Sequence, residues 1–131
     1  MPAGLSSFSE AMPATNAVAF LPATGTNYQT LITGLYSSFR VDAILATNSD
    51  SVDHVVLLAL NQSGTRHVIG SATIPAGAGT GGAAAVDVLA LAMPATVAGI
   101  PFVAVESLDA KMVVAVGAGN TVELCVVGGY F

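Results

Sequence analysis

Residues 48–70, NSDSVDHVVLLALNQSGTRHVIG, form the stretch that decides the fold class of this chain. Two β-rich runs, HVVLLALNQ and RHVIGSATI, flank Ser63-Gly64-Thr65, and a short glycine-containing loop between such runs is typical of a β-hairpin. The alternation of apolar and polar residues is lost over residues 55–60, which are all apolar. A strand that is apolar on both faces needs cover on both faces, so the question is what covers the second one.

The same pattern of short β-rich runs separated by turns continues along much of the chain. The run SFRVDAILATN at residues 38–48 alternates apolar and polar positions, as a half-buried strand does. We predict an all-β domain: an antiparallel β-sandwich or jelly-roll-like barrel of about seven or eight short strands. Residues 84–93 fit a helix or an irregular strand, so at most one short helix is expected.

The N-terminal segment differs from the rest of the chain, because it is poor in periodicity and rich in Ala, Ser, Thr and Pro. The pairs Met12-Pro13 and Leu21-Pro22 favour extended backbone. We therefore predict an extended N-terminal arm over residues 1–27 and a β-sandwich domain over residues 28–131. The arm either docks on a partner or lies across its own domain. The apolar side chains expected to make partner contacts are Leu5, Phe8, Met12, Val18, Phe20 and Leu21.

Composition limits the possible partners. Hydrophobic residues make up 53% of the chain and charged residues only 8%, against about a quarter charged in a typical soluble domain. We expect a surface of small polar residues and backbone that is partly covered by other protein. Three basic residues, Arg40, Arg66 and Lys111, are too few for a nucleic-acid footprint. Proline, glycine and asparagine interrupt the charge-free stretches, so no membrane-spanning helix is expected.

The histidines could form a metal site only if the hairpin brought them together. His54 and His67 would then need a third ligand, for which Asp53 or Asp87 is conceivable. Histidines that simply lie on a sheet are far more common, so no metal is predicted.

Two loop motifs resemble ligand sites but lack decisive residues. Asn48, Asp50 and Asp53 do not make a complete EF-hand, because the ligand spacing and the closing Glu are missing, and turn hydrogen bonds explain them better. GAGTGG at residues 77–82 has no lysine, which a phosphate-binding Walker loop requires. Its glycines are expected to let the backbone turn or approach a neighbour closely.

No catalytic pattern emerges from the remaining residues. Cys125 is the only cysteine and is flanked by apolar residues, so a small buried hydrophobe is expected there. No nucleophile motif frames a serine, and no pair of carboxylates has catalytic spacing. We predict that the chain is not an enzyme and has no cofactor.

Two segments resemble the small virion proteins of tailed bacteriophages. The first is ATNSDSVDHVVLLALNQSGTRHVIGSATIPAGAGT (Ala46 to Thr80), with an Asn-x-Asp turn, an apolar strand, a glycine turn, a second strand and IPAGAGT. The second is GNTVELCVVGGYF (Gly119 to Phe131), in which Tyr130 stands where an acidic residue often precedes the final aromatic. The resemblance covers roughly residues 28–131 and is closest to head decoration (cement) proteins.

The resemblance implies a virion structural protein that binds the outer surface of the assembled capsid and stabilises it. Such a protein would be made in the cytoplasm of the bacterial host. Its expected partners are further copies of itself, with a trimer favoured, and the major capsid protein, but neither nucleic acid nor membrane. The alternative is a tail or fibre component with a receptor- or carbohydrate-binding role. The absence of Trp counts against a sugar site.

Overall fold

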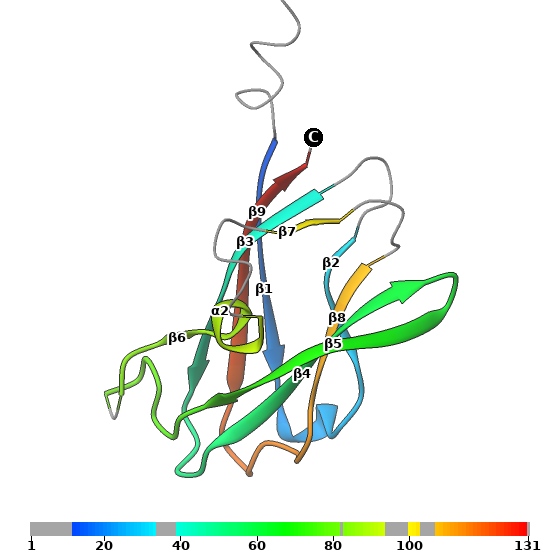
Figure 1. Cartoon of the computed structure of the whole chain (residues 1–131). Helices are drawn as coiled ribbons and strands as arrows, with labels where there is room; N and C mark the ends of the chain where they lie inside the picture. Colours follow the sequence, from blue (N-terminus) through cyan, green and yellow to red (C-terminus); the bar gives the residue numbers. More distant parts are fainter. Residues whose placement is uncertain (1–11, 34–38, 82, 94–99, 103–106, 131) are drawn as a thin grey trace, which may run out of the picture.

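The computed structural model describes residues 12–33, 39–81, 83–93, 100–102 and 107–130. These residues form a β-sandwich of two antiparallel sheets that enclose one hydrophobic core (Figure 1). The predicted all-β sandwich is therefore confirmed, and the two sheets do not close into a barrel.

The first sheet, sheet A, has five strands, and the second, sheet B, has four. Sheet A consists of β1 (Met12–Phe20), β9 (Val122–Tyr130), β3 (Phe39–Asn48) and β6 (Val86–Asp87) in that order, with β7 (Ile100–Phe102) paired to the other end of β3. Sheet B consists of β2 (Gln29–Thr33), β8 (Ser107–Met112), β4 (His54–Gln62) and β5 (Thr65–Ile74) in that order. Apart from the two-residue β6, eight strands are described, in agreement with the seven or eight short strands predicted from sequence.

The hairpin predicted around Gly64 is confirmed. Gln62 of β4 pairs with Thr65 of β5, so the loop is Ser63-Gly64. Both loop residues are left-handed, with φ of 51° at Ser63 and 82° at Gly64. A two-residue loop with positive φ at both positions matches the right-handed twist of the strands it joins.

A Gly64→Ala substitution tests the left-handed conformation of this turn. A Cβ at Gly64 would meet nothing within 4 Å, so the substitution adds only the strain of a left-handed alanine. We expect it to lower the free energy of unfolding by about 1 kcal/mol, measured by urea denaturation. Ser63→Gly, the matched control, relieves the same strain and should not destabilise the protein. A Gly64→Ala variant as stable as the wild type would contradict the left-handed turn.

Residues 84–93 contain both a strand and a helix. Val86 and Asp87 form β6, and α2 (Val88–Ala92) follows directly, while Pro22–Thr24 form a 3-10 turn, η1. The Asp87 carboxylate accepts hydrogen bonds from the N–H groups of Leu89 and Ala90 at the start of α2, as an N-cap does. Within the part of the chain that the structure describes, no helix has the length and apolarity needed to cross a membrane.

The predicted arm over residues 1–27 needs correction where the structure describes it. Residues 12–20 are β1, which pairs with β9 along its whole length, so this part belongs to the chain's own sandwich. Its last residue, Phe20, is fully buried in the core. Of the two alternatives, the structure shows the one in which the segment lies on its own domain, and no domain boundary separates β1 from β9.

The six apolar residues expected to contact a partner have different positions. Phe20 is a core residue, and Val18 is half-buried against the core. Leu21 is 47% exposed and is available to a partner. Met12 begins β1, whereas Leu5 and Phe8 lie outside the described residues.

Candidate functional site

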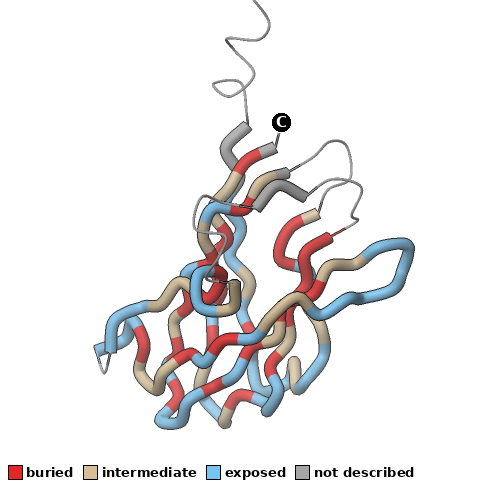
Figure 2. Tube along the Cα trace, in the orientation of Figure 1, coloured by how far each residue is buried: buried red, intermediate tan, exposed pale blue. Residues whose placement is uncertain are grey.

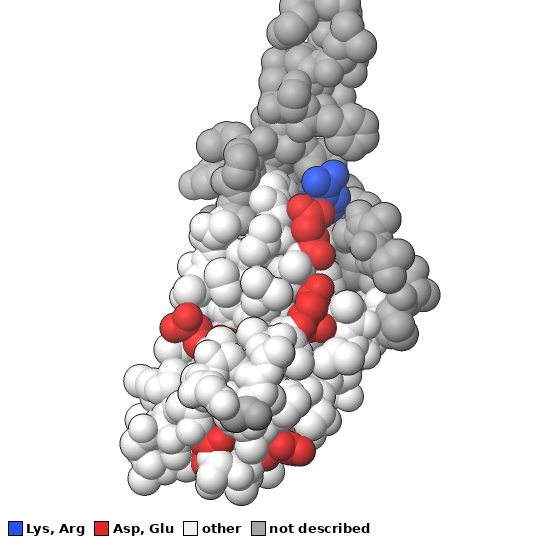
Figure 3. Space-filling view, turned by 90° about the vertical axis from the view of Figure 1, so that its left-hand side faces the viewer, with Lys and Arg blue, Asp and Glu red and all other residues white. Residues whose placement is uncertain are grey.

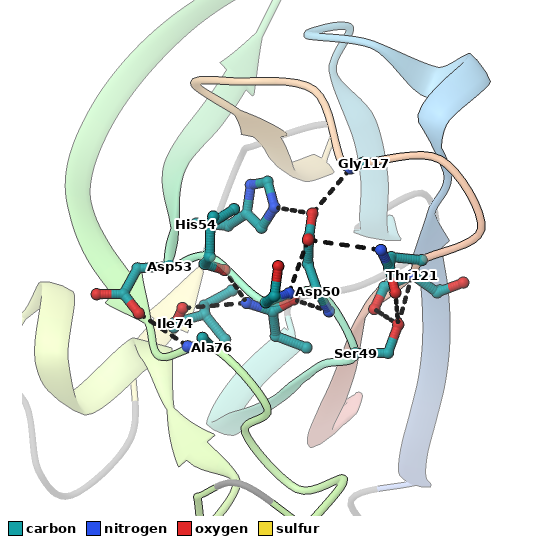
Figure 4. A network of polar contacts seen from close by, with 12 residues as sticks. Ser49, Asp50, Asp53, His54, Ile74, Ala76, Gly117 and Thr121 are labelled. Carbon is teal, nitrogen blue, oxygen red and sulfur yellow. Dashed lines mark hydrogen bonds and ion pairs between the residues drawn. The ribbon is translucent and has the colours of Figure 1, made fainter.

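A buried polar network joins the loops at one end of the sandwich (Figure 4). Its centre is the Asp50 carboxylate, whose Oδ2 lies 2.9 Å from Nε2 of His54, and both residues are buried. The carboxylate also accepts hydrogen bonds from the N–H groups of Ser51, at 2.7 Å, and Gly117, at 2.8 Å. These donors compensate the loss of hydration of a buried charge.

Asn48 extends the network to a third loop. Its Oδ1 accepts a hydrogen bond from the Asp50 N–H at 2.8 Å, and its Nδ2 donates to the carbonyl groups of Val52 at 3.0 Å and Pro75 at 3.2 Å. Together with Asp50, it ties the loops that follow β3, β5 and β8. These are the turn hydrogen bonds expected from Asn and Asp in such positions.

The acidic residues of this region do not converge on a cation position. The Asp53 side chain is exposed, and its Oδ1 accepts a hydrogen bond from the Ala76 N–H at 2.8 Å instead. Among the described residues, no three His, Cys, Asp or Glu side chains are grouped as metal ligands. The hydrogen bonds of the network therefore hold the loops in position relative to one another. Within the network, Nδ1 of His54 is buried and has no hydrogen-bond partner among the described residues.

The idea that His54 and His67 approach each other across the hairpin is wrong. In the β4–β5 register His54 pairs with Ile74, whereas His67 pairs with Leu60. The distance between the two positions along the strand is therefore on the order of 20 Å. His54 is buried and His67 is exposed, so the two histidines have unrelated environments.

The GAGTGG loop shows the close approach expected of its glycines. At Gly79, where φ is 71°, a Cβ would lie 2.6 Å from the Cγ2 atom of Thr47. The Asn48 N–H donates a hydrogen bond to the Ala78 carbonyl at 2.8 Å. The glycines thus allow this loop to lie directly against the end of β3.

The hydrogen bonds of Asp50 predict how stability depends on pH. The His54 side chain, and then the Gly117 N–H, lower the pKa of Asp50 below its ordinary value of 3.8. A lowered pKa means that the carboxylate stabilises the folded state above pH 3.8, and that this contribution is lost as the pH falls through the lowered value. Asp50→Asn should therefore be less stable than the wild type at about pH 7, and this difference should shrink toward about pH 3.

Urea midpoints measured at neutral pH and at several lower pH values would test this expectation. Asp53→Asn, which replaces an exposed carboxylate of the same loop by an amide, is the matched control for the change of side chain. A difference between Asp50→Asn and the wild type that stayed constant over the whole range would contradict the assignment.

A second polar cluster lies on the outer face of sheet B. Nε of Arg66, on β5, is 2.7 Å from Oδ2 of Asp109, on β8, and β4 lies between these two strands. Asp109 is fully buried, and its Oδ1 accepts a hydrogen bond from the Ser107 hydroxyl at 2.7 Å. The ion pair therefore crosses the outer face of β4.

The aromatic ring of Tyr28 completes this cluster. The Arg66 guanidinium carbon is 4.6 Å from the ring centroid and the Lys111 ammonium nitrogen is 5.1 Å from it, so both cations lie within cation–π range. Tyr28 and the Arg66–Asp109 pair supply part of the cover that the apolar run at residues 55–60 needs, because Ala59 on this face of β4 is fully buried. Sequence reasoning missed the cluster, since its members come from β5, β8 and the residue before β2.

Other apolar residues are exposed, and Figure 2 marks the exposed positions along the chain trace. Val55, which is 37% exposed, lies on the same outer face of β4. Cys125, expected to be buried, is only half-buried, because it points to the outer face of sheet A between Ala17 and Leu45. The exposed large apolar residues in the described part of the chain are Leu21, Leu45, Val52, Val55, Val68, Leu91, Val113 and Val114.

The charged side chains are sparse on the surface. Figure 3 shows one side of the molecule, where a single basic site and a few separate carboxylates interrupt a mostly uncharged surface. Among the described residues, Arg40 pairs with Asp42 at 2.8 Å and Arg66 pairs with Asp109.

Comparison of the chain with protein families, curated proteins and solved structures finds no match.

Proposed function

We propose that this chain is a structural protein of a tailed-bacteriophage virion, and that it decorates the outer surface of the assembled head. The observation that carries this proposal is an exterior with eight exposed large apolar residues in its described part and only 8% charged residues in the chain. Such a surface suits a protein that is bound to other protein subunits when it functions. The resemblance of residues 46–80 and 119–131 to small virion proteins supports the same role.

The mechanism of stabilisation would be mass action. A protein that binds the assembled shell but not its separated subunits shifts the equilibrium toward the shell. A rigid sandwich suits this task, because its two outer faces are preformed and little ordering is needed on binding. The proposed partners are further copies of the chain, in a homo-oligomer for which a trimer is favoured, and the major capsid protein.

Particles produced from the phage genome that encodes the chain would test the role. Mass spectrometry of purified heads and tails, separated after particle disassembly, should find the chain in the head fraction. Heads made without the gene should release their DNA at a lower temperature, and adding the purified chain should restore the wild-type temperature. Recovery in the tail fraction would support the tail or fibre alternative instead. Absence from both fractions would refute a virion role.

A further inference from the structure

Among the described residues, each outer face of the sandwich has a charged side chain that forms no ion pair, Glu123 on sheet A and Lys111 on sheet B, and these two charges are opposite in sign. On β9, Val122, Leu124 and Val126 are buried in the core, so the intervening residues point outward from sheet A. On β8, Leu108, Ala110 and Met112 are buried, so Asp109 and Lys111 point outward from sheet B. We define face A as Ala17, Leu45, Glu123, Cys125 and Val127, and face B as Val55, Leu57, Val68, Lys111 and Val113.

Face B is apolar around a single cation that is not neutralised. Lys111 pairs across the sheet with Leu57, and the Val113 N–H donates a hydrogen bond to the Val55 carbonyl, so these residues are neighbours. Val68 is 57% exposed and Val113 is 47% exposed. Among the described residues Lys111 contacts the Tyr28 ring but forms no ion pair, whereas Arg66 is neutralised by Asp109.

Face A has the corresponding arrangement with the opposite charge. Cys125 pairs with Ala17 on one side and with Leu45 on the other, and Leu45 is 45% exposed. Glu123 precedes Cys125 by two residues on the same strand and therefore lies on the same face. In the described part of the chain Glu123 has no ion-pair partner, whereas Asp42 on the same sheet is paired with Arg40.

We propose that face B of one copy of this chain docks on face A of a second copy, with Lys111 paired to Glu123 of the neighbouring copy. Each face offers apolar surface beside a charge that forms no ion pair among the described residues, and these two charges, of Lys111 and Glu123, are opposite in sign. Contact between two copies of the same face would instead bring like charges together, which opposes binding. The contact is therefore head-to-tail. Such a contact forms a ring if the rotation from each copy to the next closes on itself, and an open filament if it does not.

An exchange of charges tests this contact on the purified full-length chain. The weight-average mass is measured by light scattering and sedimentation velocity, over a range of concentrations and at low ionic strength, where exposed ion pairs are least screened. The wild type should exceed the monomer mass of 13.0 kDa as concentration rises. Lys111→Glu and Glu123→Lys should each weaken association by roughly tenfold or more, because each creates a like-charge contact.

Combining the two single substitutions provides the decisive control, because it restores opposite charges across the proposed contact. The double variant Lys111→Glu/Glu123→Lys keeps the net charge of −5 and should recover association. An equimolar mixture of the two single variants should form mixed pairs, because each variant offers the charge that the other lacks. Asp53→Lys changes net charge by the same amount as Glu123→Lys but lies on neither face, so it should associate like the wild type. Circular dichroism and thermal unfolding would verify that every variant is folded.

Three results would overturn the proposal. They are a monomeric wild type at all concentrations, association that the single substitutions leave unchanged, and loss of association in the single variants without recovery in the double variant. This contact does not depend on the proposed virion role, because it is measured on the isolated chain. If the particle experiment refuted the virion role, the proposed contact between copies would still stand. If the contact were refuted, the virion role would still be tested by the particle experiment.

Discussion

Replacing Phe20 by Ala is expected to lower the free energy of unfolding by about 3–5 kcal/mol. The Phe20 side chain is fully buried, and its pairing partner on β9, Val122, is fully buried as well. Removing the ring leaves a cavity where β1 meets the core, and β1 cannot move in to fill it without breaking its pairing with β9. Urea or thermal unfolding of the purified chain would measure the loss.

The neighbouring residue supplies the control for Phe20. Leu21 is 47% exposed, and a surface substitution of this kind usually changes stability by about 0.5 kcal/mol or less, so Leu21→Ala should unfold nearly as the wild type does. If Phe20 were a partner contact, as the sequence predicts, Phe20→Ala would weaken association and leave the monomer stable. That outcome would refute the position of β1 in the core.

Replacing Gly128 by Ala is expected to cause the second-largest loss, about 3 kcal/mol, at the upper end for an overpacked site. Gly128 lies opposite Val41, next to the irregularity in β3 between Val41 and Ala43. A Cβ at this position would overlap the carbonyl oxygen of Arg40. Because that oxygen belongs to the backbone of a paired strand, no side-chain rotation can relieve the overlap.

The position of β9 in the sheet increases this cost. β9 lies between β1 and β3, so a shift away from Arg40 compresses the pairing with β1. Gly64→Ala, whose new Cβ meets nothing within 4 Å, provides the comparison for a glycine substitution without overlap. If both variants lost the same free energy in urea titrations, the close approach of β3 and β9 at Gly128 would be refuted.

The elements that can be predicted from sequence are those controlled by neighbouring residues. The Ser63-Gly64 turn joins two strands, as its glycine and its flanking β-rich runs indicate. The alternating run at residues 39–48 corresponds to β3, but its faces were predicted only in part. Simple alternation puts Leu45 on the apolar face with Val41 and puts Ile44 on the other face. The irregularity between Val41 and Ala43 shifts the alternation, so that Ile44 is buried and Leu45 is exposed. Asn48 and Asp50 form the local turn hydrogen bonds that such side chains favour.

The features that sequence reasoning misses depend on pairing between distant residues. No local pattern shows that residues 12–20 pair with residues 122–130, so the sequence predicts Phe20 in an arm although it lies in the core. Only the register of β4 and β5 shows that the two histidines are apart. The Asp50–His54 pair also escapes notice, although its i, i+4 spacing across a turn is a usable signal.

The sequence by itself determined that this protein is an all-β sandwich of short strands with a low surface charge. These properties follow from composition, alternation and turn residues, whose energetic preferences act over a few neighbouring positions. Only the tertiary structure decided which side chains cover the outer face of β4 and which charges lack an ion-pair partner on faces A and B. Arg66, Tyr28 and Asp109 meet because strand order places β4 between β5 and β8. That order is selected by the burial of the whole core, to which distant strands contribute at once.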